Sequence, residues 1–201
     1  IASNSIRRAG ITLGLFALCG VVLLSSVQWL TKDSIAQNTR QRHLQRLHAI
    51  IPPNAYDNDL LGSAQQQGIN HPTLDSQVII YTGQLNGLAV AKVFEVTSLE
   101  GYSGAIRLLV GVNIADNSLL GVRVTAHKET PGLGDKIETN KSDWMLQFAG
   151  KSLNNPSFEQ WRVKKEGGAF DQFTGATITP RAVVNAVREV LRLNTTQGGH
   201  S

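Results

Sequence analysis

Residues 78–97 read VIIYTGQLNGLAVAKVFEVT, and this stretch decides the fold. β-branched and aromatic residues, which favour strands, dominate on both sides of Asn86-Gly87. Asn-Gly favours a two-residue hairpin turn, because both residues tolerate a positive φ. The stretch therefore predicts two antiparallel strands, at residues 78–82 and 88–97, joined by a tight turn.

A second pair of strands and a helix follow along the chain. Residues 105–114 and 119–125 are again rich in strand-forming residues, and the polar residues 115–118 between them predict a turn. Residues 180–193, PRAVVNAVREVLRL, place valine and leucine at spacings of three and four, as an amphipathic helix does. The predicted fold class is α+β, with a mainly antiparallel sheet closed by a C-terminal helix.

A long apolar stretch lies near the N-terminus. Residues 11–30, ITLGLFALCGVVLLSSVQWL, carry no charged side chain, and as a helix they would be about 30 Å long, the thickness of a bilayer's hydrocarbon core. Arg7 and Arg8 precede the stretch, so the positive-inside rule places the N-terminus in the cytoplasm. A cleaved signal peptide is the alternative, but no small-residue cleavage site follows. We expect a single-pass anchor that is retained.

The chain is expected to have three parts. The anchor covers residues 1–31, and a polar helix with a loose apolar stripe connects it, over residues 32–53, to the rest of the chain. Two prolines, Pro52 and Pro53, end that helix. Residues 54–201 form the domain outside the cytoplasmic membrane, and residues 54–76 at its start read as a polar loop.

Charge and motif content exclude several classes of function. The net charge of +4 comes from 19 basic and 15 acidic residues without a clustered basic face, so nucleic-acid binding is not indicated. Cys19 is the only cysteine and the sequence has no HExxH, so no metal site is predicted. The motifs of serine hydrolases, P-loops and dinucleotide-binding folds are absent from the sequence as well.

Residues 171–181, DQFTGATITPR, place three threonines just before the predicted helix. Proline favours the first helical position and threonine the N-cap, so Thr179 before Pro180 is predicted to cap the helix. Thr174 precedes a glycine and is explained by a turn. Thr177 has small neighbours and lies close to a helix N-terminus, whose free N–H groups suit a phosphate. The residues by themselves therefore indicate an accessible hydroxyl beside a potential anion site.

Two stretches of the chain resemble parts of one known family. Asp171-x-x-Thr174-Gly175-Ala176-Thr177 resembles the flavinylation motif D-x-x-(S/T)-G-A-T. Residues 127–134, HKETPGLG, resemble the H-x-E-T-P-G-L-G loop of the same FMN-binding domain family. The anchor, the two hairpins, the loop and the motif occur in family order, so the resemblance covers essentially the whole chain. It points to the G subunits of the Rnf (Rsx) electron-transport complexes, which are paralogues of the C subunit of the sodium-translocating NADH:quinone reductase.

The resemblance implies one covalent FMN per chain. A dedicated flavin transferase would join the FMN phosphate to Thr177, which then acts as an acceptor once and is not a turnover nucleophile. No catalytic residue is expected in this chain. The further cofactor-binding residues that the resemblance implies come from the motif and the loop: Asp171, Thr174, Gly175, Ala176, Glu129, Thr130, Leu133 and Gly134.

The resemblance also implies a role and a location. The chain would be an electron-relay subunit of an ion-translocating ferredoxin:NAD⁺ oxidoreductase in the bacterial inner membrane, with its FMN domain in the periplasm. Its partners would be the other membrane subunits and the iron–sulfur subunits of that complex. One alternative is a C-type subunit of a sodium-translocating NADH:quinone reductase. The other is a non-redox anchored module that binds a ligand or partner, with Thr177 as an ordinary turn residue.

Overall fold

A computed structural model describes residues 2–198 of the chain. Ile1 and residues 199–201, the last three of the expected domain 54–201, lie outside the described residues. The chain divides into two units, Ile1–Leu44 and Gln45–Ser201.

Helix α1 runs from Ala2 to His48 without a break. Its apolar side chains between residues 10 and 32 are exposed, among them Leu13, Phe16 and Trp29. By length and composition, α1 is the one helix in the described part of the chain that could cross a membrane. The hydroxyls of Ser26 and Thr31 donate to backbone carbonyls one turn earlier, so these polar groups have partners within the helix itself.

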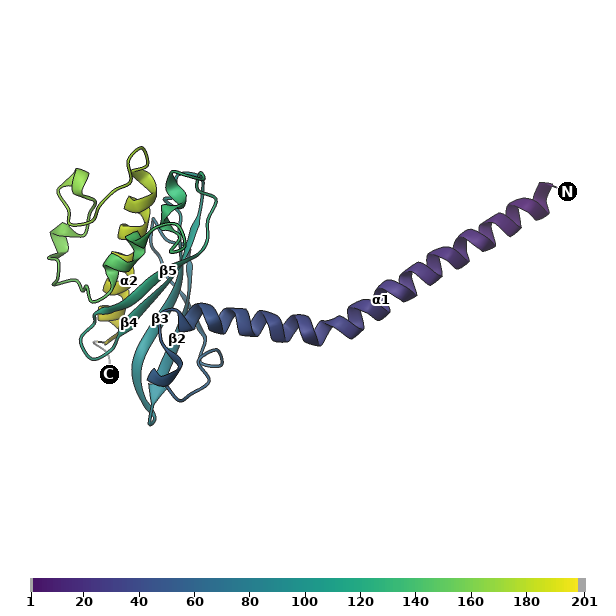
Figure 1. Cartoon of the computed structure of the whole chain (residues 1–201). Coiled ribbons are helices and arrows are strands. Elements are labelled where there is room, and N and C mark those ends of the chain that lie inside the picture. The colour runs from purple at the N-terminus through teal and green to yellow at the C-terminus, as the bar shows by residue number, and fades with distance from the viewer. Residues whose placement is uncertain (1, 199–201) are drawn as a thin grey trace. The chain divides into compact units, whose positions relative to one another are not determined.

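The second unit is built on a five-stranded antiparallel sheet (Figure 1). Each strand pairs with the next one along the chain, and the order is β1 (Gln65–Gly68), β2 (Gln77–Leu85), β3 (Leu88–Ser98), β4 (Ile106–Asn113) and β5 (Leu119–Ala126). Asn86 and Gly87 have φ values of 54° and 78° and form the predicted turn between β2 and β3. The two predicted hairpins are thus confirmed. Strand β1 lies in the segment that was expected to be a loop, because its polar sequence QQQG gives no strand signal.

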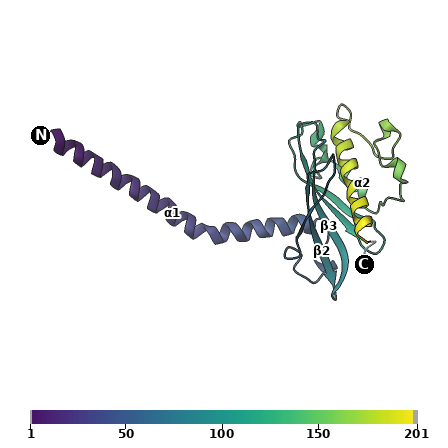
Figure 2. The ribbon, with the colours of Figure 1, turned by 180° about the vertical axis from the view of Figure 1, so that it is seen from behind.

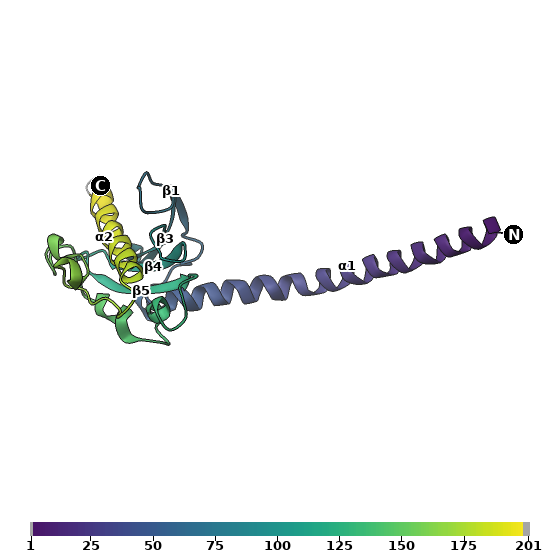
Figure 3. The same cartoon turned by 90° about the horizontal axis from the view of Figure 1, so that it is seen from above.

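Helix α2 (Ile178–Gly198) covers one face of the sheet (Figure 2). The view from above shows the same two layers (Figure 3). The apolar face of α2 is buried together with inward-facing residues of the strands, in a core that includes Val183, Val184, Val187, Val190, Leu191, Phe94, Leu108 and Val110. The predicted α+β class, with a sheet closed by a C-terminal helix, is confirmed.

The opposite face of the sheet has a smaller core of its own. Leu47, Ile50 and Ile51, at and just after the end of α1, are buried against residues of β2, β3 and β4. A Cβ at Gly111 of β4 would overlap the side chain of Ile50, so the strand needs a glycine where this segment crosses it. The start of the second unit is therefore part of the folded domain.

Short 3₁₀ helices connect the larger elements. They are η1 (Pro53–Ala55), η2 (Gly134–Ile137), η3 (Asp143–Phe148), η4 (Phe158–Gln160) and η5 (Lys164–Glu166). At and after the end of η3, the buried rings of Phe148, Trp161 and Phe170 lie against one another within the main core. This aromatic packing holds the long irregular segment that leads to the flavinylation-like motif.

Candidate functional site

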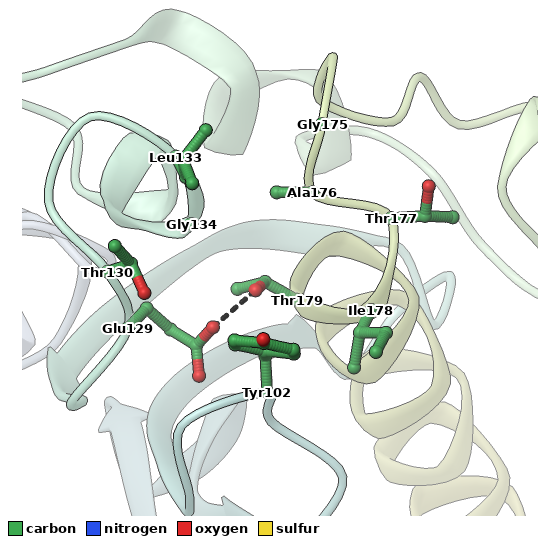
Figure 4. A pocket seen from close by; sticks show the side chains of 10 residues that line it. All are labelled: Tyr102, Glu129, Thr130, Leu133, Gly134, Gly175, Ala176, Thr177, Ile178 and Thr179. Carbon is green, nitrogen blue, oxygen red and sulfur yellow. Dashed lines mark hydrogen bonds between the residues drawn. The ribbon is translucent and has the colours of Figure 1, made fainter.

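A cavity of about 370 Å³ opens where three loops meet (Figure 4). The loops follow β3 and β5 and precede α2. Its lining residues are Tyr102, Glu129, Thr130, Leu133, Gly134, Gly175, Ala176, Thr177, Ile178 and Thr179. The two stretches that the sequence singled out, residues 127–134 and 171–177, therefore line one cavity, whose volume falls in the usual range for small-molecule sites.

Two residues of the motif lie outside this cavity. The Asp171 side chain is 62% exposed, and its carboxylate pairs with Lys164 at 2.6 Å. Thr174 is exposed at the tip of a turn, beside Gly175 with a φ of 80°. The structure thus separates Asp171 and Thr174 from the other seven predicted site residues, which all line the cavity.

Hydrogen bonds and an aromatic contact hold the turn that carries the motif. The Ala176 N–H donates to the Phe173 carbonyl at 3.1 Å and closes the turn. Gly175 within this turn has a positive φ, which a residue with a side chain would adopt less readily. The ring of Phe173 lies edge-to-face with Trp144, 5.1 Å between centroids, and the Trp144 indole N–H donates to the Asp171 carbonyl at 2.7 Å. Aromatic packing and one indole hydrogen bond therefore set where the motif lies.

Helix α2 begins at Ile178, two residues earlier than the sequence predicted. Thr177 precedes the helix, and its carbonyl accepts the first helical hydrogen bond, from the Arg181 N–H at 3.2 Å. Thr179 lies inside the first turn and is only 1% exposed, so the prediction that Thr179 caps the helix is wrong. The physical reason is that proline is tolerated throughout the first turn, where its missing N–H costs no helical hydrogen bond.

The Thr177 hydroxyl is left without a partner among the described residues. A threonine at the N-cap normally accepts from the second or third helical N–H. The third helical residue here is Pro180, which has no N–H to offer. The side chain of Thr177 lies at the rim of the cavity and points away from Glu129 and Leu133 (Figure 4). The N–H groups of the first helical turn lie beside it, at the positive end of the α2 dipole.

Glu129 places a buried carboxylate on the wall of the cavity. It is 5% exposed, and one of its oxygens accepts from the Ser103 N–H at 3.0 Å. The other oxygen accepts from the Thr179 hydroxyl, which ties the loop to the first turn of α2 (Figure 4). A Cβ at Gly134 would lie 2.8 Å from the Thr179 hydroxyl and 2.9 Å from the Glu129 carboxylate, so this pair needs a glycine beside it.

A network of hydrogen-bonded and charged side chains holds the loop at residues 127–134. The Glu129 N–H donates to Nδ1 of His127, whose Nε2 lies 3.0 Å from Glu138. Lys141 hydrogen-bonds both Glu138, at 2.9 Å, and Asp135, at 2.8 Å. These hydrogen bonds from Lys141 lower the pKa of both carboxyl groups, and the same bonds raise the pKa of Lys141. The network fixes the backbone that presents Glu129.

Tyr102, Ile178 and Thr179 line the cavity but were not predicted as site residues. Tyr102 is 69% exposed and lies across the cavity from the loop, so its ring offers a flat apolar surface. It lies between Gly101 and Gly104, and a Cβ at Gly101 would overlap the Gly104 carbonyl. The one feature of the sequence that could have pointed to Tyr102 is an aromatic residue placed between two glycines in a tight loop.

Comparisons with known proteins match both ends of the chain. Residues 2–50 match the RnfG N-terminal region, and residues 101–192 match the FMN-binding domain family. The G subunit of the ion-translocating oxidoreductase complex of Pseudomonas aeruginosa strain PAO1 is 50% identical over 192 residues, which cover 94% of this chain and 88% of that protein. The G subunit of the Photorhabdus laumondii complex is 49% identical over 190 residues, 92% and 88% of the two chains.

The chain belongs to the family of G subunits of ion-translocating oxidoreductase complexes. The resemblance found in the sequence is therefore confirmed at the level of the family. The FMN-binding match spans the whole cavity, because every lining residue falls between positions 101 and 192. Among solved structures, NqrC of Shewanella oneidensis is similar, with 25% identity and a TM-score of 0.46 over 69% of this chain and 70% of that one.

Proposed function

We propose that this chain is the electron-relay subunit of an ion-translocating ferredoxin:NAD⁺ oxidoreductase and carries one FMN as a phosphoester on Thr177. The observation that carries the proposal is the Thr177 hydroxyl, which has no partner among the described residues and lies at a helix N-terminus on the rim of the cavity. The family match supports FMN as the ligand of this region.

The residues around the cavity fit FMN. The first-turn N–H groups of α2 and the positive end of its dipole suit the phosphate. Leu133 and Tyr102 offer apolar surfaces for a flat ring, and Gly134 and Gly175 keep side chains out of its way. FMN supplies one- and two-electron chemistry that side chains lack, while this chain binds and orients it. The proposed contacts are Glu129, Thr130, Leu133, Gly134, Gly175 and Ala176.

Asp171 and Thr174 take a different part in the proposal. Both are exposed and neither lines the cavity, and they stand six and three residues before the acceptor in the chain. We assign them to the shape of the turn and to recognition by the flavin transferase during maturation, in place of the cofactor contacts that the sequence suggested. A free threonine hydroxyl is a weak nucleophile, so the activating base belongs to the transferase.

The membrane arrangement follows from α1. Residues 1–31 would anchor the chain in the inner membrane, with the N-terminus in the cytoplasm and residues 54–201 in the periplasm after the connecting segment 32–53. Residues 11–30 hold no charged side chain, so the ion path must be built by the other membrane subunits. Electrons would pass between this FMN and the iron–sulfur centres of those partners.

The test of this function uses membranes that contain the whole complex. Ferredoxin-dependent reduction of NAD⁺ is measured with wild-type chain, with Thr177→Ala and with the matched control Thr177→Ser, which keeps a hydroxyl. We expect Thr177→Ala to lose at least about 90% of the rate, because one relay centre is missing, and Thr177→Ser to keep a substantial part of it. An undiminished rate with Thr177→Ala would refute the relay role.

A further inference from the structure

Glu129 differs from the other strongly buried acidic residues in having no cationic partner in the described part of the chain. Asp135 is paired with Lys141, and Glu189 is paired with Arg188 and Arg192. Both hydrogen-bond partners of the Glu129 carboxylate, the Ser103 N–H and the Thr179 hydroxyl, are neutral donors. The cavity wall therefore carries one buried carboxylate whose charge no side-chain cation offsets.

The two donors suit the ionised form of this group. Each carboxylate oxygen accepts one hydrogen bond, and neither partner needs to accept one in return. Thr179 lies in the first turn of α2, where the helix dipole also favours a negative charge. The fold thus provides two donors for a negative charge at a buried place, where water screens a charge little.

We infer that Glu129 sets the reduction potential of the FMN proposed at Thr177, and that its uncompensated charge lowers this potential. The inference rests on the proposed function. Full reduction of FMN takes two electrons from a neighbouring redox centre of the complex and, at neutral pH, one proton from solvent. The ring then carries one more negative charge than before. A buried carboxylate on the same cavity wall repels that charge, so it favours the oxidised cofactor.

The size of the effect can be bounded by Coulomb's law. Two unit charges about 6 Å apart, at an effective permittivity of about 20, change an equilibrium by on the order of a hundredfold. The cavity is open on one side, so we expect a smaller effect, of at least about tenfold in the ratio of reduced to oxidised flavin at a fixed solution potential.

The test compares Glu129→Gln with wild type in the full chain, purified with its flavin in detergent. The flavin is titrated with dithionite in the presence of redox dyes, and its absorbance gives the ratio of reduced to oxidised cofactor. Glu129→Gln is expected to raise this ratio at least about tenfold at a fixed potential. Glu138→Gln is the matched control, because Glu138 undergoes the same chemical change but is offset by Lys141. We expect it to change the ratio by less than about threefold.

A second variant covers the case in which Glu129→Gln does not fold. Thr179→Val keeps the shape of the buried side chain but removes the hydroxyl donor. The carboxylate then keeps only the Ser103 N–H as a donor, so the ratio of reduced to oxidised flavin should fall, opposite in direction to Glu129→Gln. A rise with Thr179→Val, or equal shifts with Glu129→Gln and Glu138→Gln, would overturn the inference while the covalent flavin stands. A wild-type chain without flavin would instead remove the proposed function, and the inference with it.

Discussion

At the scale of single residues, Gly134 is the cavity glycine that leaves the least room for an added side chain. A methyl group there would lie 2.8 Å from the Thr179 hydroxyl and 2.9 Å from the Glu129 carboxylate, and both groups are buried. We predict that Gly134→Ala lowers the stability of the domain by about 1–3 kcal/mol, because the buried pair must shift. Thermal unfolding followed by tryptophan fluorescence measures this.

Gly68→Ala is the control for that measurement. Gly68 lies in β1 with nothing near the position of an added methyl group, so we expect a change within about 0.5 kcal/mol. Equal melting temperatures for Gly134→Ala and wild type would show that the loop yields freely and that the Glu129–Thr179 pair is not held in place.

Lys141 gives a prediction about pH. The pKa values of Asp135 and Glu138 are lowered in the folded chain, first of all by hydrogen bonds from Lys141. Groups with a lowered pKa stabilise the fold above their unfolded values, near pH 4, and this stabilisation is lost as the pH falls through the folded values. Lys141→Gln should therefore melt at a lower temperature than wild type at pH 7, and the difference should shrink below about pH 4.

Melting temperatures measured between pH 7 and pH 3 check this prediction. Lys128→Gln is the control, since Lys128 is exposed and forms no ion pair with any described residue. If the melting temperatures of both lysine variants equal those of wild type at every pH, the hydrogen bonds from Lys141 do not stabilise the fold.

At the scale of elements, the start of α2 decides whether the acceptor hydroxyl is free. A threonine N-cap accepts from the N–H of the second or third helical residue, and Pro180, the third, has none to offer. Pro180→Ala restores this donor, and a capping hydrogen bond is worth about 1 kcal/mol, so we predict that flavin attachment slows about fivefold. The measurement is the flavin-labelled fraction over time with the flavin transferase.

Thr195→Ala is the matched control for the helix itself. Thr195 is exposed in the last turns of α2, far along the chain from the acceptor, and alanine there raises helix propensity without adding a donor near Thr177. An attachment rate that is unchanged in Pro180→Ala would mean that capping does not compete with modification.

The elements also show what the sequence can and cannot reveal. The hairpins were predictable because Asn86-Gly87 and β-branched runs act locally, over a few residues. Strand β1 was not, since its polar residues pair only because β2 offers an edge. The loop and the motif were recognised, but their shared cavity and the exposure of Asp171 depend on tertiary packing around Trp144 and Phe173. Tyr102 was missed because its role comes from position alone.

At the scale of the whole molecule, the boundary between the two units can be tested by truncation. The division falls after residue 44, and Leu47, Ile50 and Ile51 belong to the core on the back of the sheet. A chain that starts at residue 45 should therefore fold and stay in solution without detergent. A chain that starts at residue 52 loses three buried side chains, worth roughly 5 kcal/mol or more, and should be unfolded or aggregated.

Circular dichroism and gel filtration of the two truncated chains check this expectation. If both fold equally well, the segment after α1 contributes little to the core. If neither folds, the domain needs residues of the first unit, and the division at residue 44 is wrong.

The measurement that tests the central claim most directly is the intact mass of the chain, purified from its own membranes and denatured. The account predicts that the wild type is heavier than its sequence by one FMN minus water. Thr177→Ala should lack this increment, and Thr177→Ser should retain it at least in part. An unmodified wild-type mass, from cells with an active flavin transferase, would contradict the account.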